Sequence, residues 1–122
     1  MDKPLAGRRF LVVEDETMIL MMIEGMLEDL GCTSITAAGT CDQAIFQIKD
    51  KHFDAAMLDM NLDGHDSQVV ADALAARGIP FLYSTGYITG HDMRDGFHGR
   101  AVLRKPFSFE ELNAALARLI GG

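Results

Sequence analysis

The sequence predicts an α/β protein built on a doubly wound, five-stranded parallel sheet with helices on both faces. Short apolar runs alternate five times with segments of helical periodicity, which is the pattern of consecutive strand–helix units. Glycine, proline and helix-capping residues stand at the boundaries between these segments. The 122 residues, 48% of them hydrophobic, suffice for one domain with a core and are too few for two.

The first strand is expected at Arg9–Val13, where one charged residue leads into four apolar ones. A helix follows over Thr17–Leu30 with apolar residues at helical spacing. It should end there because Gly31 stands in the position just past a helix end. The second strand is expected at Thr33–Ala37.

The second helix should begin after Thr40, whose side chain can accept a hydrogen bond from a backbone N–H while Gln43 reaches back. The third strand, Ala55–Leu58, is entirely apolar, as a strand covered on both faces should be. The third helix is expected to follow Asp66 or Ser67.

Gly78 should end the third helix and lead into a strand at Phe81–Ser84. Four glycines weaken the helical pattern of Gly86–Gly99, because each costs about 1 kcal/mol relative to alanine, so we expect a short or mobile fourth helix there. A fifth strand is expected at Ala101–Leu103, and Ser108–Glu111 form a second capping box that opens the last helix.

Composition excludes several classes of protein. The net charge of −7 and the pI near 4.9 argue against nucleic acid or an anionic membrane as a partner. The longest apolar run, Met18–Ile23, is far too short to span a membrane, and the N-terminus has no apolar signal region. We expect a cytoplasmic protein in which Cys32 and Cys41 are free thiols.

Polar residues follow four of the predicted strands. They are Glu14 and Asp15 after the first strand, Asp59 after the third, Thr85 after the fourth and Lys105 after the fifth. Because the carboxyl ends of parallel strands meet at one edge of the sheet, these side chains should converge. Three carboxylates, a hydroxyl and an ammonium in one pocket can hold a divalent cation and form a phosphoryl-aspartate.

Asp59 is the expected nucleophile of this pocket, because a strand-end carboxylate beside other carboxylates can attack phosphorus once their repulsion is relieved. A hard divalent cation such as Mg²⁺ would relieve it, since Mg²⁺ prefers oxygen ligands. Lys105 and the hydroxyl of Thr85 would each contact a phosphoryl oxygen.

These residues and their order resemble the receiver domain of two-component response regulators (CheY-like), over about residues 8–119 and including the pair Lys105-Pro106. The resemblance implies the flavodoxin-like strand order 2-1-3-4-5. Because the sequence ends at Gly121-Gly122, directly after the last expected helix, we expect residues 1–122 to form a single, stand-alone receiver domain with no output domain.

The resemblance further implies a role for each site residue. Asp59 would be the phosphoacceptor. Asp15 and Asp59 would bind Mg²⁺ or Mn²⁺ directly, with the backbone carbonyl of Asn61 as a third ligand and Glu14 acting through a metal-bound water. A cis peptide between Lys105 and Pro106 would direct the lysine into the pocket.

The chain departs from the family pattern at several positions. The segment Tyr83–Tyr87 partly resembles the Phe-Ala-Thr-Gly-x-Tyr signature of single-domain receivers of alphaproteobacteria, linked to general stress signalling. Tyr83 and Ser84 replace its Phe and Ala, and the final Tyr is displaced by one residue. Val102 stands where receivers place an aromatic residue that couples to the threonine. Asp63 adds a carboxylate that either contacts the metal or faces water.

The function implied is that of a phosphorelay receiver, which takes a phosphoryl group from a histidine kinase or a histidine phosphotransfer protein. It would signal by contact with a downstream protein, or act as a phosphate shuttle or sink, and would not be a multiple-turnover enzyme. Two alternatives stay open: a metal-dependent phosphatase with Asp59 as nucleophile, and a degenerate receiver that only binds a partner.

Methionine is concentrated in the first helix, at positions 18, 21, 22 and 26. Part of this helix must face the core, but its apolar arc is wider than one stripe. Either the surplus is ordinary exposed methionine, or it forms a docking face for a helix of the phosphodonor.

Overall fold

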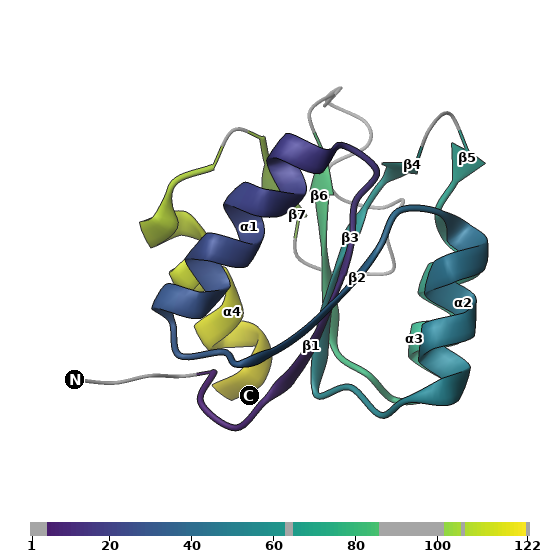
Figure 1. Ribbon diagram of the computed structural model, residues 1–122, viewed down its shortest axis with the longest axis horizontal. Coiled ribbons are helices and arrows are strands. Elements are labelled where there is room, and N and C mark those ends of the chain that lie inside the picture. Colours follow the sequence, from purple (N-terminus) through teal and green to yellow (C-terminus); the bar gives the residue numbers. More distant parts are fainter. Residues whose placement is uncertain (1–4, 63–64, 86–101, 106, 122) are drawn as a thin grey trace.

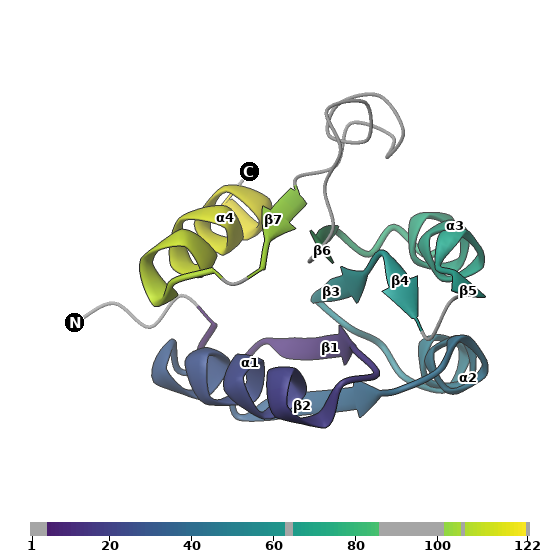
Figure 2. The same cartoon turned by 90° about the horizontal axis from the view of Figure 1, so that it is seen from above.

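Five parallel strands form one sheet in the computed structural model, which describes residues 5–62, 65–85, 102–105 and 107–121. The spatial order is β2-β1-β3-β6-β7 (Figure 2). Counted along the chain this is 2-1-3-4-5, so the predicted fold class and strand order are confirmed. The strands of this sheet are β1 (Arg9–Val13), β2 (Ser34–Ala38), β3 (Ala55–Asp59), β6 (Phe81–Thr85) and β7 (Val102–Arg104).

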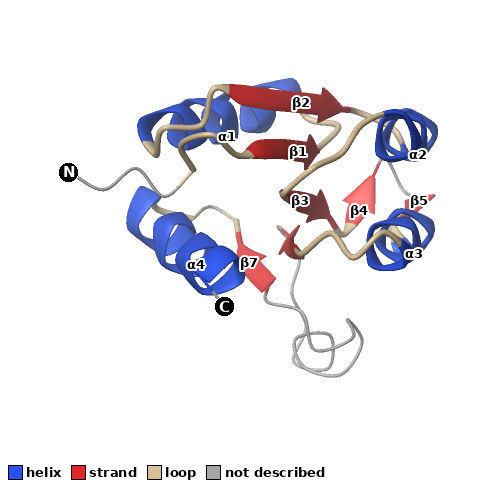
Figure 3. Cartoon of the chain, turned by 90° about the horizontal axis from the view of Figure 1, so that it is seen from below, coloured by secondary structure: helices blue, strands red, loops and turns tan. Residues whose placement is uncertain are grey.

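The helices within the described residues cover both faces of the sheet. One pair, α1 and α4, lies on one face and the other pair, α2 and α3, on the opposite face (Figures 1 and 3). The expected short helix within residues 86–99 falls outside the described residues. The helices are α1 (Thr17–Asp29), α2 (Cys41–Asp50), α3 (Gln68–Ala76) and α4 (Phe109–Gly121).

Two apolar clusters, one on each face of the sheet, form the core. Strand side chains alternate between them: Val12 packs with the cluster of α1 and α4, while Leu11 and Val13 pack with that of α2 and α3. Every residue of β3 and β6 is buried, which is why these strands are mostly apolar up to their polar ends. The site residues therefore stand at the ends of a rigid, buried platform.

Gly31 and Gly78 end α1 and α3 as the sequence predicts. Both have positive φ angles, 95° and 69°, which glycine adopts without a side-chain penalty. The amide of Gly31 donates to the carbonyl of Glu28 (2.9 Å) and that of Cys32 to Leu27 (3.0 Å). These two bonds form a Schellman motif.

The two predicted capping boxes differ in detail. Ser108 and Glu111 form both bonds, since each side chain accepts from the other residue's amide at 3.1 and 2.8 Å. At α2 the amide of Gln43 donates to Thr40 Oγ1 (3.1 Å), but Gln43 Oε1 accepts from Gly39 (2.8 Å) rather than from Thr40. The side chain of Gln43 therefore stabilises the loop at Gly39, one residue before the position that a capping box would bind.

Several predicted boundaries shift by one residue. Asp59 and Thr85 are the last residues of β3 and β6, and the predicted ranges ended just before them. Pairing continues through the polar residues because Asp59 stands in register with Ser84. A short antiparallel pair, β4 (Asn61–Leu62) and β5 (His65–Asp66), was not predicted.

Both cysteines are free, as expected: Cys32 is buried and Cys41 partly so. Among the described helices, none combines the length and the apolar character that a membrane span needs.

Candidate metal and phosphoacceptor site

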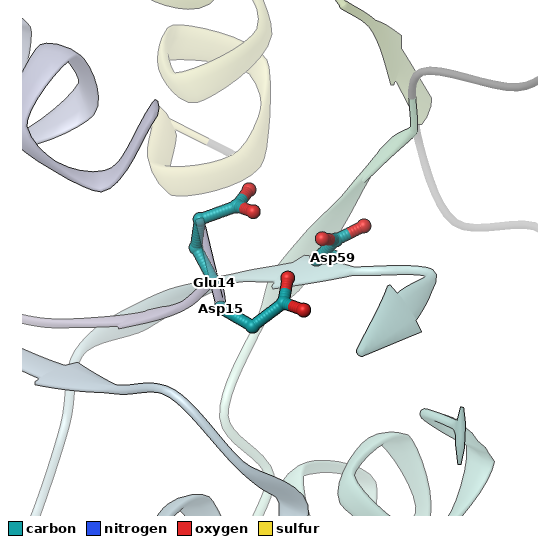
Figure 4. A group of neighbouring side chains, drawn as sticks. All are labelled: Glu14, Asp15 and Asp59. Carbon is teal, nitrogen blue, oxygen red and sulfur yellow. The ribbon is translucent and has the colours of Figure 1, made fainter. Parts of the chain in front are cut away.

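The site lies where the winding of the sheet changes direction. From β1 the chain leads first to β2 on one side and later to β3 on the other, and such a switch point opens a crevice at the carboxyl ends of the strands. Glu14 and Asp15 follow β1 directly, and Asp59 ends β3. Their carboxyl groups lie beside one another at this edge (Figure 4).

The three carboxylates suit a hard divalent cation. Glu14, Asp15 and Asp59 each offer an oxygen, and these oxygens lie within 4.8 Å of one another. Glu14 and Asp59 are 1% and 4% exposed, whereas Asp15 is more open to solvent. Buried carboxylates repel each other unless a positive charge compensates them, and Mg²⁺ prefers such oxygen ligands. The donor set therefore fits this class of metal.

Lys105 supplies positive charge to this cluster. Its Nζ lies 2.8 Å from Glu14 Oε1 and 3.3 Å from Asp59 Oδ2, and its side chain is 11% exposed. The sequence predicted that Lys105 enters the pocket, but it gave no indication of the short ion pair with Glu14. Three carboxylates around one ammonium still leave excess negative charge.

Burial and the charges of the pocket shift two pKa values. Burial raises the pKa of Glu14 from 4.5 to about 7, and Asp59 adds to this rise while the hydrogen bond and charge of Lys105 oppose it. Burial alone would lower the pKa of Lys105, but the hydrogen bond to Glu14 and the charges of Asp59 and Glu14 raise it above 10.5. The ammonium thus stays charged.

Metal-free protein should lose stability as the pH rises. The folded protein raises the pKa of Glu14 above its value in the unfolded chain. The contribution of Glu14 to folding stability is therefore complete below the unfolded-state pKa and is lost as the pH rises through the folded-state pKa. The loss amounts to at most about 3 kcal/mol. Thermal melts in chelator should show a midpoint that falls between about pH 5 and pH 8, and Glu14→Gln should remove most of that fall. An equal pH slope in both proteins would contradict the assignment.

Thr85 and Asn61 lie at the same edge. Thr85 is buried, and its carbonyl accepts a hydrogen bond from the amide of Lys105 at 2.7 Å. Thr85 and Lys105 therefore lie side by side, at the carboxyl ends of β6 and β7. Asn61 opens β4, two residues after Asp59; its role as a carbonyl ligand stays a prediction.

Three further expectations concern the surroundings of the site. Val102, in the usual aromatic position, opens β7 in register with buried Tyr83. Asp63 and the peptide bond to Pro106 fall outside the described residues.

Comparisons with known proteins agree on one family. A family model described as the response regulator receiver domain matches residues 10–117. The two-component response regulator PhoP of Pseudomonas aeruginosa is 29% identical over 116 residues, which cover 92% of this chain and 51% of PhoP. The chain spans about half the length of the curated relatives it matches.

Solved structures are similar to this chain in sequence and in fold. SdrG of Sphingomonas melonis Fr1 is 43% identical with a TM-score of 0.80, covering 96% of this chain and 98% of that one. The receiver domain of the sensor histidine kinase PA1611 of Pseudomonas aeruginosa, with a magnesium ion coordinated in its active site cleft, is 28% identical with a TM-score of 0.82, covering 96% and 100%. The chain belongs to the response regulator receiver domain family of two-component systems.

Proposed function

We propose that this chain accepts a phosphoryl group on Asp59 from a histidine kinase or a histidine phosphotransfer protein. The observation that carries the proposal is the meeting of three carboxylates with Lys105, whose Nζ is shared between Glu14 and Asp59. The magnesium ion in the active site of the PA1611 receiver domain supports Mg²⁺ as the cofactor here, with Asp15 and Asp59 as direct ligands. Glu14 and the carbonyl of Asn61 complete the proposed ligand set.

In the proposed reaction a carboxylate oxygen of Asp59 attacks phosphorus. An O–P bond forms to Asp59, the P–N bond to the donor histidine breaks, and the imidazole leaves with that electron pair and takes a proton. Lys105 provides an N–H to a phosphoryl oxygen, and Thr85 provides its hydroxyl to another. Bound Mg²⁺ supplies the remaining neutralisation of phosphoryl charge.

Incubation with acetyl phosphate and Mg²⁺, followed by intact mass measurement, tests this function. The expected result is a gain of one phosphate per chain that requires Mg²⁺ and disappears in Asp59→Asn. Steady release of phosphate from simple esters, far beyond one per chain, would instead identify the phosphatase alternative. Mg²⁺ binding without any gain of phosphate would identify a receiver that only binds a partner.

The exposed face of α1 is the proposed docking surface for the donor. Met18, Met21 and Met22 are 84%, 63% and 38% exposed. Gly25 extends this line of exposed methionines at helical spacing, and a Cβ at Gly25 would meet no atom within 4 Å. This line of residues begins three residues after Asp15, so a protein bound to it would lie beside the carboxylates. Methionine adapts to varied apolar partners.

Met18→Glu and Met22→Glu should each slow phosphotransfer from a histidine kinase that phosphorylates the wild-type chain. A buried charge at the centre of an interface opposes docking, and we expect a loss of about tenfold. Phosphorylation by acetyl phosphate should be unchanged, because this small donor needs no docking. Phe46→Glu is the matched control, since Phe46 is 63% exposed on α2 across the sheet. Unchanged transfer in both methionine variants would refute the docking surface.

The output is proposed to be a protein contact that depends on phosphorylation, in a cytoplasmic setting that keeps Cys32 and Cys41 reduced. SdrG has also been solved in a BeF3-activated conformation, 41% identical to this chain, which makes the same reagent a natural mimic here. Pull-downs with and without BeF3 separate the two roles. A partner captured only with BeF3 indicates a switch, and equal capture indicates a shuttle or sink.

A further inference from the structure

Ser84 is a buried polar residue on an inner strand of the sheet, near the carboxyl edge. It is 1% exposed and is the fourth residue of β6, a strand buried throughout. In the ladder it stands in register with Asp59 of β3 on one side and with Leu103 of β7 on the other. Neighbouring strands lie about 4.8 Å apart, so Ser84 is a direct neighbour of the proposed phosphoacceptor.

The side chain of Ser84 shares a face with the charged groups. Side chains two residues apart on a strand point the same way. Leu82, two residues before Ser84, and Met57, two residues before Asp59, both belong to the cluster under α1 and α4. Val12 belongs to it as well, which places Glu14 on that face. Glu14 just past β1, Asp59 on β3 and Ser84 on β6 therefore form a row across three neighbouring strands.

Lys105 crosses this row from the other end. It follows β7, yet its Nζ reaches Asp59 on β3 and Glu14 beyond β1. β6 lies between β7 and β3, and Leu103, two residues before Lys105, belongs to the cluster under α1 and α4. The lysine side chain, which meets the carboxylates on that same face, therefore crosses the carboxyl end of β6 on the side that carries Ser84. A large side chain at position 84 would obstruct that path, and a small one leaves it open.

The need for a small side chain does not by itself explain why position 84 is a serine. Alanine or glycine would leave the same space, whereas a buried hydroxyl without a hydrogen bond costs about 1–3 kcal/mol. The carbonyl of Ser84 is already occupied by the amide of Met60 (3.0 Å), as expected within a ladder. The polar side chains nearest in the row are a carboxylate, which accepts up to four hydrogen bonds, and an ammonium, which donates three.

We propose that Ser84 is a positioning residue of the phosphoryl site, whose hydroxyl donates to the Asp59 carboxylate and orients it for metal binding and attack. The inference rests on the proposed function for its kinetic consequence, but its effect on Mg²⁺ affinity does not. The position gives the chain a second hydroxyl beside the phosphoacceptor, in addition to that of Thr85. Misplacing a reacting group by even about 1 Å can cost up to two orders of magnitude in rate.

Three substitutions separate the hydroxyl from the size of the side chain. Ser84→Ala keeps the space and loses the hydroxyl, while Ser84→Thr and Ser84→Val have the same shape and differ only in the hydroxyl. The measurements are the rate constant of phosphorylation by acetyl phosphate at saturating Mg²⁺, the Mg²⁺ dissociation constant by calorimetry and the thermal midpoint. Ala should be about tenfold slower than wild type, and Val about tenfold slower than Thr. Mg²⁺ should bind the Val variant several-fold more weakly than the Thr variant.

Equal rates and equal Mg²⁺ affinities for Thr and Val, or an Ala variant that matches wild type, would overturn the role of Ser84. If the Thr and Val variants are phosphorylated equally slowly and the Ala variant matches wild type, position 84 needs only a small residue that leaves the path of Lys105 open. If wild type itself gains no phosphate, the proposed function fails, and the Mg²⁺ affinities of the Thr and Val variants alone decide on Ser84.

Discussion

Replacing Lys105 with methionine should cost the metal-free protein about 3 kcal/mol of folding stability at about pH 8. Methionine keeps the volume and removes the ammonium that lies 2.8 Å from Glu14 and 3.3 Å from Asp59. Both carboxylates are buried, and a buried charge without its partner is costly. Chemical denaturation in the presence of a chelator measures the loss.

Two conditions should restore the folding stability of the Lys105→Met variant. At about pH 5.5 the cost should shrink, because Lys105 normally lowers the pKa of Glu14 and its removal makes that carboxyl protonate more readily. Mg²⁺ should stabilise this variant more than wild type, since it becomes the main counter-charge of the cluster. Lys49→Met, which removes an exposed lysine from the last turn of α2, is the control and should change stability little. A variant as stable as wild type at about pH 8 would refute the electrostatic account of the pocket.

Asp59→Asn should leave the metal-free protein as stable as wild type or more stable, by up to about 2 kcal/mol. Lys105 attracts the aspartate, whereas Glu14 and Asp15 repel it. Removing its charge relieves both repulsions and leaves the lysine to Glu14. The same change deletes the nucleophile and a metal ligand, so stabilisation by Mg²⁺ should weaken strongly. Thermal melts with and without Mg²⁺ measure both effects.

Asp50→Asn is the matched control for this change, because it removes the same charge from the exposed end of α2. Its response to Mg²⁺ should equal that of wild type. A clear drop in the metal-free melting temperature of Asp59→Asn, absent from Asp50→Asn, would mean that Asp59 is held by net attraction and would count against the pocket described here.

Much of the fold could be predicted from local chemistry. Gly31 and Gly78 end their helices with the bonds that the glycine position indicates, and Ser108 and Glu111 form the expected capping box. The convergence of site residues followed from one rule, that parallel strands share a carboxyl edge. The apolar runs fixed where each strand would lie, to within a residue or so.

The rest depends on contacts between strands, which no local pattern encodes. Asp59 and Thr85 belong to their strands because β3 and β6 continue to pair through them. The β4–β5 pair is two residues long in each strand, too short for any periodicity. The ion pair of Lys105 with Glu14 became visible only once the order of the strands was known. Ser84 stood out in the sequence only as a departure from the family signature, because one small polar residue at the end of an apolar run has no period that would indicate its role.

The central claim is that Asp59 carries the phosphoryl group, and trapping the acyl phosphate tests it most directly. Borohydride reduces an acyl phosphate to an alcohol and converts the aspartate into homoserine, which peptide mass spectrometry locates in the chain. After treatment with acetyl phosphate and Mg²⁺, homoserine should occupy position 59 and no other aspartate position. Homoserine at another aspartate such as Asp15, or phosphate gained with Asp59 unreduced, would contradict the account.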